Sequence, residues 1–244
     1  MQRSMQKNIS VPTASGAGAH RGRGRPREFD REAALAKAMR LFWTKGYEAT
    51  SISDLTKALG VGSTSLYAAF GSKDALYAEA LRYYSTTYED LVLGRFRQAA
   101  TAREAAFAYL WDSAAAMTGA DCDLPRGCMV TLGTVGSDGH DELGDLMRKA
   151  RGEAFNALLP RLQRGVAEGE LPESLDIAKL ARFLQTVQSG MAIRARDGAD
   201  RAELQAIAEI AMAGWDRLVD GAAARGASPA SPAHRAGDTP ARSR

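Results

Sequence analysis

The sequence has few of the features that mark secreted, membrane or zinc-binding proteins. Its two cysteines, Cys122 and Cys128, are too few for a disulfide framework, and their spacing does not suit a zinc site. No run of about 18 or more apolar residues occurs, and the polar N-terminus carries no apolar signal core. We therefore expect a cytoplasmic protein that has no membrane partner.

The sequence also lacks the motifs of common catalytic sites. No glycine-rich phosphate loop follows a strand, and neither a His-Glu-x-x-His motif nor a nucleophile elbow occurs. The three histidines, His20, His140 and His234, are far apart in the sequence, whereas a hydrolase or a metal enzyme needs a dense polar cluster. His140 has acidic neighbours, but its context is more typical of a loop residue than of a metal ligand. We expect no enzyme, no cofactor and no metal.

Charge is distributed unevenly along the chain, although the net charge is only +3. Residues 1–29 carry a balance of +5 and residues 221–244 a balance of +3, which leaves −5 for residues 30–220. A basic arm on an acidic body indicates that the arm meets a polyanion. Both ends are rich in Gly, Ala and Ser, so residues 1–28 and 221–244 are predicted to be a disordered arm and a disordered tail.

Arginines occupy alternate positions in the arm, at Arg21, Arg23, Arg25 and Arg27, with glycines between the first three. Taken alone, this pattern is typical of a solvated linker. Directly before a DNA-binding domain it is also typical of an arm that lies along phosphates or enters a narrow minor groove, through Arg23 and Arg25.

The stretch from Thr50 to Lys73 predicts two short helices joined by a tight turn. Ser51 is placed to cap the first helix, with Asp54 as the acidic partner of a capping box, and Gly60 supplies the left-handed residue that ends it. The apolar positions expected to anchor the two helices in a core are Ile52, Leu55, Leu59, Leu66 and Phe70.

The second of these helices, Ser63 to Phe70, is expected to expose a slim face of small and hydroxyl-bearing side chains. A helix of that kind can enter a major groove about 12 Å wide. Two short helices around a glycine also occur in domains that bind no DNA, but a helix from Asp30 to about Lys45 completes a three-helix unit here. We therefore predict a helix-turn-helix DNA-binding domain over residues 29–75. Its exposed face comprises Ser63, Thr64, Ser65, Tyr67, Ala68 and Ala69.

Residues 76–220 are predicted to form a larger helical domain, which makes an all-α protein of about nine helices. Ser72 is placed to cap a long helix that connects the two domains. Pro160 falls inside one helical pattern and predicts a kink there. The other expected helices are Ala102–Met117, a short one over Cys128–Val135, Asp141–Glu168, and two more over residues 176–196 and 200–219.

Apolar residues in the last two helices repeat at alternating spacings of three and four. The two helices can satisfy this pattern by packing on each other. Phe183, Ile210 and Trp215 lie off these seams and also need burial, which a four-helix interface with a second copy of the chain would supply. We expect a homodimer through residues 176–196 and 200–219.

Four short motifs stand together in the N-terminal part: Gly-Tyr-x-x-Thr-Ser-Ile at 46–52, Leu-Gly-Val at 59–61, Leu-Tyr-x-x-Phe at 66–70, and the Ser-Lys pair at 72–73. With these motifs, the segment from Arg23 to Leu81 resembles the N-terminal domain of the TetR/AcrR family of transcriptional regulators. The resemblance implies a helix-turn-helix head, a larger helical domain, a two-fold dimer and a double-stranded operator DNA as partner.

The resemblance also implies roles for individual residues. Thr50 and Ser51 would hold a phosphate, as would the Tyr67 hydroxyl and the Lys73 ammonium. The bases would be read by Ser63, Thr64 and Ser65, with Ala68 and Ala69 close to the groove. Family members often have Lys at position 63, Gly at 64 and an aromatic residue or His at 68 or 69, so the operator sequence does not follow from the resemblance.

The larger domain has more residues than dimerisation requires, which favours a repressor released from its operator by a small-molecule effector. A constitutive DNA-binding protein without an effector is the alternative, and an enzyme with a DNA-binding head is disfavoured by the missing motifs. A thiol-based redox or electrophile sensor is a further alternative, because Arg126 is placed to lower the pKa of a nearby thiol. The candidate effector-binding residues are Trp111, Met117, Cys128, Met129, Phe155, Phe183 and Met191.

Overall fold

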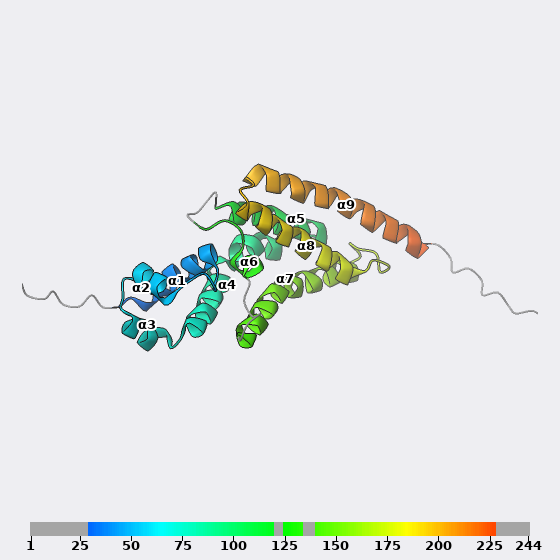
Figure 1. Ribbon diagram of the computed structural model, residues 1–244. Coiled ribbons are helices and arrows are strands. Elements are labelled where there is room, and N and C mark those ends of the chain that lie inside the picture. The colour runs from blue at the N-terminus through cyan, green and yellow to red at the C-terminus, as the bar shows by residue number, and fades with distance from the viewer. Residues whose placement is uncertain (1–28, 120–123, 134–139, 228–244) are drawn as a thin grey trace, which may run out of the picture. The chain divides into compact units, whose positions relative to one another are not determined.

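The computed structural model describes residues 29–119, 124–133 and 140–227, and every regular element in them is a helix. None of these helices combines the length and the apolar character that a membrane span requires. In chain order (Figure 1) the elements are α1 (Arg31–Lys45), α2 (Ile52–Leu59), α3 (Ser63–Phe70), α4 (Lys73–Gln98), α5 (Ala102–Thr118), α6 (Met129–Leu132), α7 (Asp141–Ala167), α8 (Ile177–Arg196) and α9 (Arg201–Ala227).

The helices α1 to α3 and the start of α4 form the head, around one apolar core. The capping box predicted for α2 is confirmed: Ser51 Oγ accepts from the Asp54 amide at 3.0 Å, and the Asp54 carboxylate accepts from the Ser51 amide at 3.0 Å. Gly60 ends α2 with φ 71°, a left-handed conformation that glycine adopts without steric cost. Leu55, Leu66 and Phe70 are buried as predicted.

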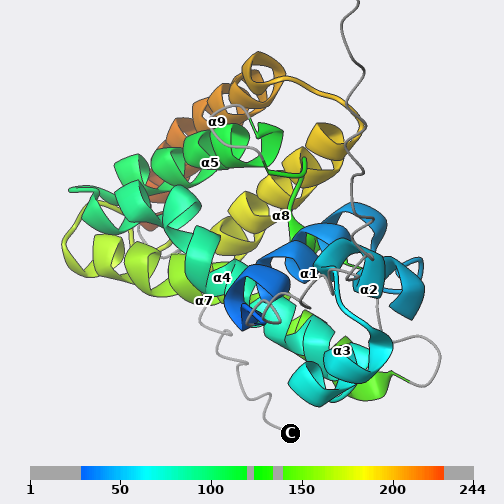
Figure 2. The same cartoon turned by 90° about the vertical axis from the view of Figure 1, so that its left-hand side faces the viewer.

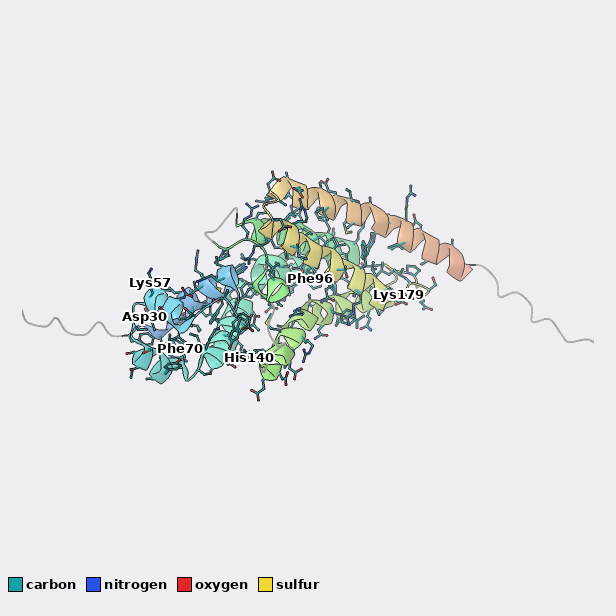
Figure 3. The ribbon with its side chains drawn as sticks, in the orientation of Figure 1. Asp30, Lys57, Phe70, Phe96, His140 and Lys179 are labelled. Atoms are coloured by element: carbon teal, nitrogen blue, oxygen red, sulfur yellow. The ribbon has the colours of Figure 1, made fainter. Side chains whose placement is uncertain are left out.

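The body is organised around α5, which packs against α4, α7, α8 and α9 (Figure 2). Alanines fill much of its surface, and Ala102, Ala105, Ala106 and Ala114 are completely buried. Because small side chains let neighbouring helices approach closely, this alanine-rich helix can be surrounded on several sides. Larger residues of the neighbouring helices, such as Phe96 on α4 (Figure 3), complete the core.

Two boundaries differ from the expectation. The short helix α6 covers only Met129–Leu132, and residues 134–139 lie outside the described ranges. The last helix continues to Ala227, so residues 221–227 are helical and do not belong to a tail. Ala222 is fully buried and its carbonyl accepts a hydrogen bond from Ser174 Oγ at 2.6 Å. The composition of this segment predicts a tail, but its first residues include several alanines, which have the highest helix propensity.

The apolar seams of α8 and α9 are buried in the body of their own chain. Leu180, Leu184 and Leu204 all lie in the same core as α5. The expectation that Trp215 needs a second chain for burial is wrong, since Trp215 is 3% exposed within that core. Phe183 and Ile210 are 40% and 75% exposed, as an interface with another chain requires.

Candidate nucleic-acid interface and effector cavity

Helix α3 presents the exposed face that the sequence predicts. Ser63, Thr64, Ser65 and Ala68 are exposed, and Tyr67 is 44% exposed. Ala69 is only half-buried, and the opposite side of the helix packs into the head core. The outward face carries hydroxyls and methyl groups without any charged side chain, so its contacts with base edges would be short.

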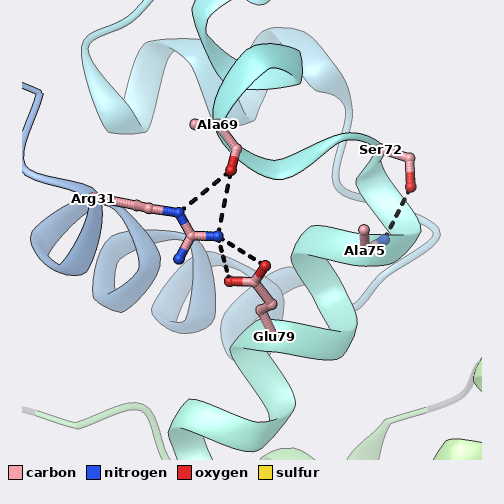
Figure 4. A network of polar contacts seen from close by, with 5 residues as sticks. All are labelled: Arg31, Ala69, Ser72, Ala75 and Glu79. Atoms are coloured by element: carbon pink, nitrogen blue, oxygen red, sulfur yellow. Dashed lines mark hydrogen bonds and ion pairs between the residues drawn. The ribbon is translucent and has the colours of Figure 1, made fainter.

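An arginine that sequence reasoning missed holds the end of α3 in place (Figure 4). Arg31 on α1 donates from Nε and Nη2 to the Ala69 carbonyl, both at 3.3 Å, and from Nη2 to both carboxylate oxygens of Glu79 on α4 at 2.8 Å. Its guanidinium also lies 4.6 Å from the centre of the Phe70 ring. One planar cation thereby joins three helices of the head and fixes the orientation of the exposed face.

The four residues expected at phosphates have different surroundings. Ser51 is exposed at the N-terminus of α2, and Tyr67 is exposed on α3. Lys73 is half-buried, with its ammonium 4.1 Å from the centre of the Tyr47 ring. Thr50 is fully buried and its hydroxyl donates to the Gly46 carbonyl at 2.6 Å, so this hydroxyl is already paired, and the phosphate contact implied for Thr50 stays a prediction. Arg23 and Arg25 lie outside the described residues.

A polar cluster joins the head to the beginning of α7. The Tyr47 hydroxyl donates to the Asp74 carboxylate, and the other oxygen of Asp74 is 3.0 Å from His140 Nδ1. The hydrogen bond from Tyr47 is the main reason why the pKa of Asp74 lies below its ordinary value. His140, predicted in a loop, occupies the residue before α7. No group of His, Cys, Asp and Glu suited to a metal ion occurs in the described part of the chain.

A partly open cavity of about 510 Å³ lies in the body. Residues of α4, α5, α6, α7 and α8 line it together with Cys128, which precedes α6. Pockets for drug-sized molecules have volumes of about 300–1,000 Å³, so the cavity is large enough for a small ligand. Its main lining side chains are Tyr84, Tyr88, Val92 and Leu93 from α4, Tyr109 from α5, Cys128, Val130 and Thr131, Ala150, Arg151, Glu153 and Ala154 from α7, and Gln185, Gln188 and Ser189 from α8.

Of the seven residues predicted to bind an effector, only Cys128 lines this cavity. Met117, Met129 and Met191 are buried in the apolar cores, where they pack without reaching the cavity. The aromatic candidates are also occupied elsewhere: Trp111 stacks on Phe107, the Phe155 ring lies 3.6 Å from the Arg182 guanidinium, and Phe183 is exposed. The tyrosines of the cavity were missed because their helical spacing marks them as core residues.

Two hydroxyls lie deep in the cavity wall near the thiol. The Tyr84 hydroxyl donates to Cys128 Sγ at 3.3 Å. Tyr109 is 1% exposed, and its hydroxyl has no hydrogen-bond partner among the described residues. Burial is the main cause that raises the pKa of both tyrosines, so both are protonated near neutral pH.

A second arginine outside the predicted sites connects the body to the head. Arg196, the last residue of α8, donates to the carbonyls of Trp43 at 2.7 Å and Thr44 at 3.1 Å, in the last turn of α1. Its Nε also donates to the Arg126 carbonyl at 3.2 Å, in the segment before Cys128. These carbonyls at the end of α1 have no partner within their own helix, and a cation there is favoured by the helix dipole.

The head defines a helix-turn-helix protein whose second helix faces outward over a packed three-helix core. Residues 34–80 match the model of the bacterial regulatory proteins of the tetR family. Over 204 residues the chain is 36% identical to the HTH-type transcriptional repressor ComR of Escherichia coli, covering 82% of this chain and 95% of that protein. It is 31% identical to the repressor BdcR of the same organism over 192 residues, covering 78% and 90% of the two chains.

The structure also resembles that of a cysteine mutant of the TetR family transcriptional regulator CifR complexed with a 26-base-pair operator DNA. The two share 37% identity with a TM-score of 0.74, over 79% of this chain and all of the other. The chain therefore belongs to the TetR family of bacterial regulatory proteins.

Proposed function

We propose that the protein is a homodimeric transcriptional repressor that binds operator DNA through α3 and is released from it by a small molecule bound in the body. The observation that carries the proposal is the exposed, uncharged face of α3, held by Arg31 against α1 and α4. It is supported by the relatives, since ComR and BdcR are named repressors and the CifR structure contains operator DNA. As a DNA-binding regulator of a bacterial family it acts in the cytoplasm, and we assign it no catalytic role.

On the operator, base edges and phosphates would be contacted by different residues. Ser63, Thr64 and Ser65 at the start of α3 are the candidates for base contacts, because the N-terminal residues of a recognition helix reach base edges. Ser51, Tyr67 and Lys73 are the candidates for phosphates. Lys73 must exchange its contact with the Tyr47 ring for a phosphate when DNA binds.

The dimer would form through the exposed apolar face of α8 and α9. Phe183 and Ile193 on α8, and Ile210 and Leu218 on α9, are between 40% and 75% exposed. Gly190 lies between the two apolar residues of α8, and an added Cβ there would meet no atom within 4 Å. A small residue between exposed apolar ones allows helices of two copies to approach closely.

Ile210→Glu is expected to give a monomer in sedimentation velocity; a variant that stays dimeric would place the interface elsewhere.

Effector and operator would be coupled through α4, which belongs to both parts of the protein. Its first turns, with Leu76 and Tyr77, are buried in the head, whereas Tyr84 and Tyr88 further along line the cavity. A ligand that tilts α4 would move the two recognition helices of a dimer away from the spacing of one DNA turn, about 34–36 Å. A tenfold change in operator affinity requires about 1.4 kcal/mol of coupling free energy.

A second candidate function is a thiol-based sensor, and it rests on the position of Cys128. The thiol lines the cavity and accepts a hydrogen bond from the Tyr84 hydroxyl, so a molecule inside the cavity can reach it. Cys128→Ser tests this function. Loss of effector response with operator binding retained supports the sensor, and an unchanged response removes it.

The proposed function is tested by selecting bound fragments from genomic DNA with the purified protein and mapping the protected sequence. Thr64→Ala or Ser65→Ala should then change base preference within that sequence, by about 1–3 kcal/mol for each affected pair. Thr86→Ala is the matched control, since it also removes one hydroxyl but lies on α4, outside the head core. An unchanged base preference in both α3 variants would contradict the assignment of α3 as the reading helix.

A further inference from the structure

The Tyr109 hydroxyl is the one buried polar group of the cavity wall, within the described residues, that has no hydrogen-bond partner. Buried hydroxyls in proteins are almost always paired, and each exception calls for an explanation. The nearby Tyr84 hydroxyl differs, because it is already committed to Cys128 Sγ. Tyr109 lines the cavity and therefore offers an uncommitted but buried hydrogen in its wall, which a ligand would contact after a small movement of the neighbouring side chains.

The charged residues around the cavity lie at its exposed edge. Glu89, Arg151 and Glu153 are exposed, and two of them already have partners: Glu89 pairs with Arg97, and Arg151 donates to the Gly133 carbonyl at 3.0 Å. Val92, Leu93, Cys128 and Ala154, which pack against the core that contains Tyr109, are uncharged, and so is Tyr84, which contacts Cys128. An ionised ligand group placed there would lose its water without gaining a counter-ion, which is strongly unfavourable.

Three tyrosines contribute aromatic rings to the wall. Tyr84 and Tyr88 lie 5.7 Å apart between ring centres on α4, and Tyr109 lies on α5. Aromatic rings favour stacked or edge-on contacts with other rings. Such a wall favours a flat, unsaturated ligand over a flexible aliphatic one.

We propose that the cavity binds an uncharged aromatic carbonyl compound whose oxygen accepts the hydrogen bond of Tyr109. This inference rests on the proposed function in one respect, namely that the cavity is the effector site. The chemical preference itself follows from the unpaired hydroxyl, the uncharged surroundings and the aromatic wall. A carbonyl oxygen supplies the acceptor that Tyr109 lacks, without bringing a charge to a position where none is compensated.

Three naphthalene derivatives of equal heavy-atom count test the proposal with the full-length, DNA-free protein in isothermal titration calorimetry. 2-Acetonaphthone carries the carbonyl, 2-isopropenylnaphthalene replaces its oxygen with a methylene group, and 2-naphthoate replaces the acetyl group with a carboxylate. The ketone should bind about fivefold tighter than the hydrocarbon, as one net hydrogen bond implies, and the carboxylate should bind most weakly. Absence of binding by all three, or a carboxylate that binds as tightly as the ketone, would overturn the proposal.

Tyr109→Phe removes the hydroxyl and keeps the ring, so the fold is expected to persist, which circular dichroism verifies. In this variant the preference for the ketone over the hydrocarbon should disappear. Tyr84→Phe is the matched control, because it removes a hydroxyl of the same cavity that is already paired with Cys128, and it should keep the preference. A ketone preference that survives Tyr109→Phe would refute the role of Tyr109.

Operator binding is measured separately, so that the two proposals fail independently. A ketone that binds through Tyr109 but does not change operator affinity would leave the cavity chemistry intact and refute the effector role. Failure of the ligand-free protein to select any DNA would refute the proposed function, whatever the calorimetry shows.

Discussion

Replacing Arg196 by methionine should weaken the contact between the head and the body without unfolding either. Methionine keeps an unbranched apolar side chain of good helix propensity but removes all donors. The variant loses the hydrogen bonds to the carbonyls of Trp43, Thr44 and Arg126. A typical net contribution is about 1 kcal/mol per hydrogen bond, and the bond to Thr44 is exposed and counts for less.

We therefore expect the free energy of unfolding to fall by about 2–3 kcal/mol. For a protein of this size that corresponds to a decrease in Tm of about 5–10 °C. Urea denaturation followed by circular dichroism measures the change. If the head and the body no longer unfold in one transition, the unfolding curve also broadens, because the head then unfolds at a lower urea concentration than the body.

Arg194→Met is the control, two residues earlier on the same helix. Arg194 pairs with Glu203 at 2.8 Å and with Asp197 at 3.9 Å, on the exposed surface of α8 and α9. Exposed ion pairs contribute little, so this variant should unfold almost like the wild type. Equal unfolding curves for the two variants would refute the claim that Arg196 ties α1 to the body.

Three further predictions address the interface, the polar cluster and the segment before Cys128. Lys73→Ala should lower the slope of log affinity against log salt by about 0.9 for each head. Lys179→Ala makes an equal charge change far from Phe70 in Figure 3 and should leave the slope unchanged. Fluorescence anisotropy measures both slopes, and equal slopes for the two variants would contradict a phosphate contact of Lys73. Asp74→Asn should lower the free energy of unfolding at neutral pH. Its difference from wild type should shrink as pH falls below about 4, because a carboxylate with a lowered pKa stabilises the fold only while it is ionised. A difference in unfolding free energy that persists in urea titrations at acid pH would argue against this. Gly127→Ala should lower the free energy of unfolding by about 2–4 kcal/mol, since φ is 85° and the new Cβ would lie 2.4 Å from Leu132 Cδ1. Gly60→Ala also has a positive φ but open space around the new Cβ, so it should lower the free energy of unfolding by only about 1 kcal/mol. Similar decreases in Tm for the two variants would exclude the steric cause.

Local signals in the sequence were sufficient to predict the head. Ser51, Asp54 and Gly60 act on backbone groups a few residues away, so their roles follow from spacing alone. The same holds for Ser72, whose hydroxyl accepts from the Ala75 amide at 3.0 Å (Figure 4). Thr50 is the exception, because its burial depends on how the turn after α1 packs.

The cavity could not be predicted in the same way. Tyr84, Tyr109 and Cys128 come together from three segments, and only the packing of α4, α5 and α6 brings them to one wall. Arg196 likewise contacts carbonyls more than 150 positions away in the sequence. The sequence did contain one usable signal. A buried tyrosine carries a hydroxyl that needs a hydrogen-bond partner, whereas a leucine at the same core position has no such group.

The magnitudes indicate how a ligand in the cavity can control the head. Cys128 lines the cavity, and the neighbouring Gly127 is fixed through its amide to the Met117 carbonyl at 2.8 Å. The carbonyl of Arg126, one residue further back, accepts from the same Arg196 guanidinium that holds α1. A displacement at Cys128 therefore acts on the groups that position Arg196. Loss of the Arg196 contacts, at about 2–3 kcal/mol, is of the same order as the roughly 1.4 kcal/mol of coupling that a tenfold change in operator affinity requires, and it would count toward that coupling only as far as the contacts differ between the DNA-bound and the released protein.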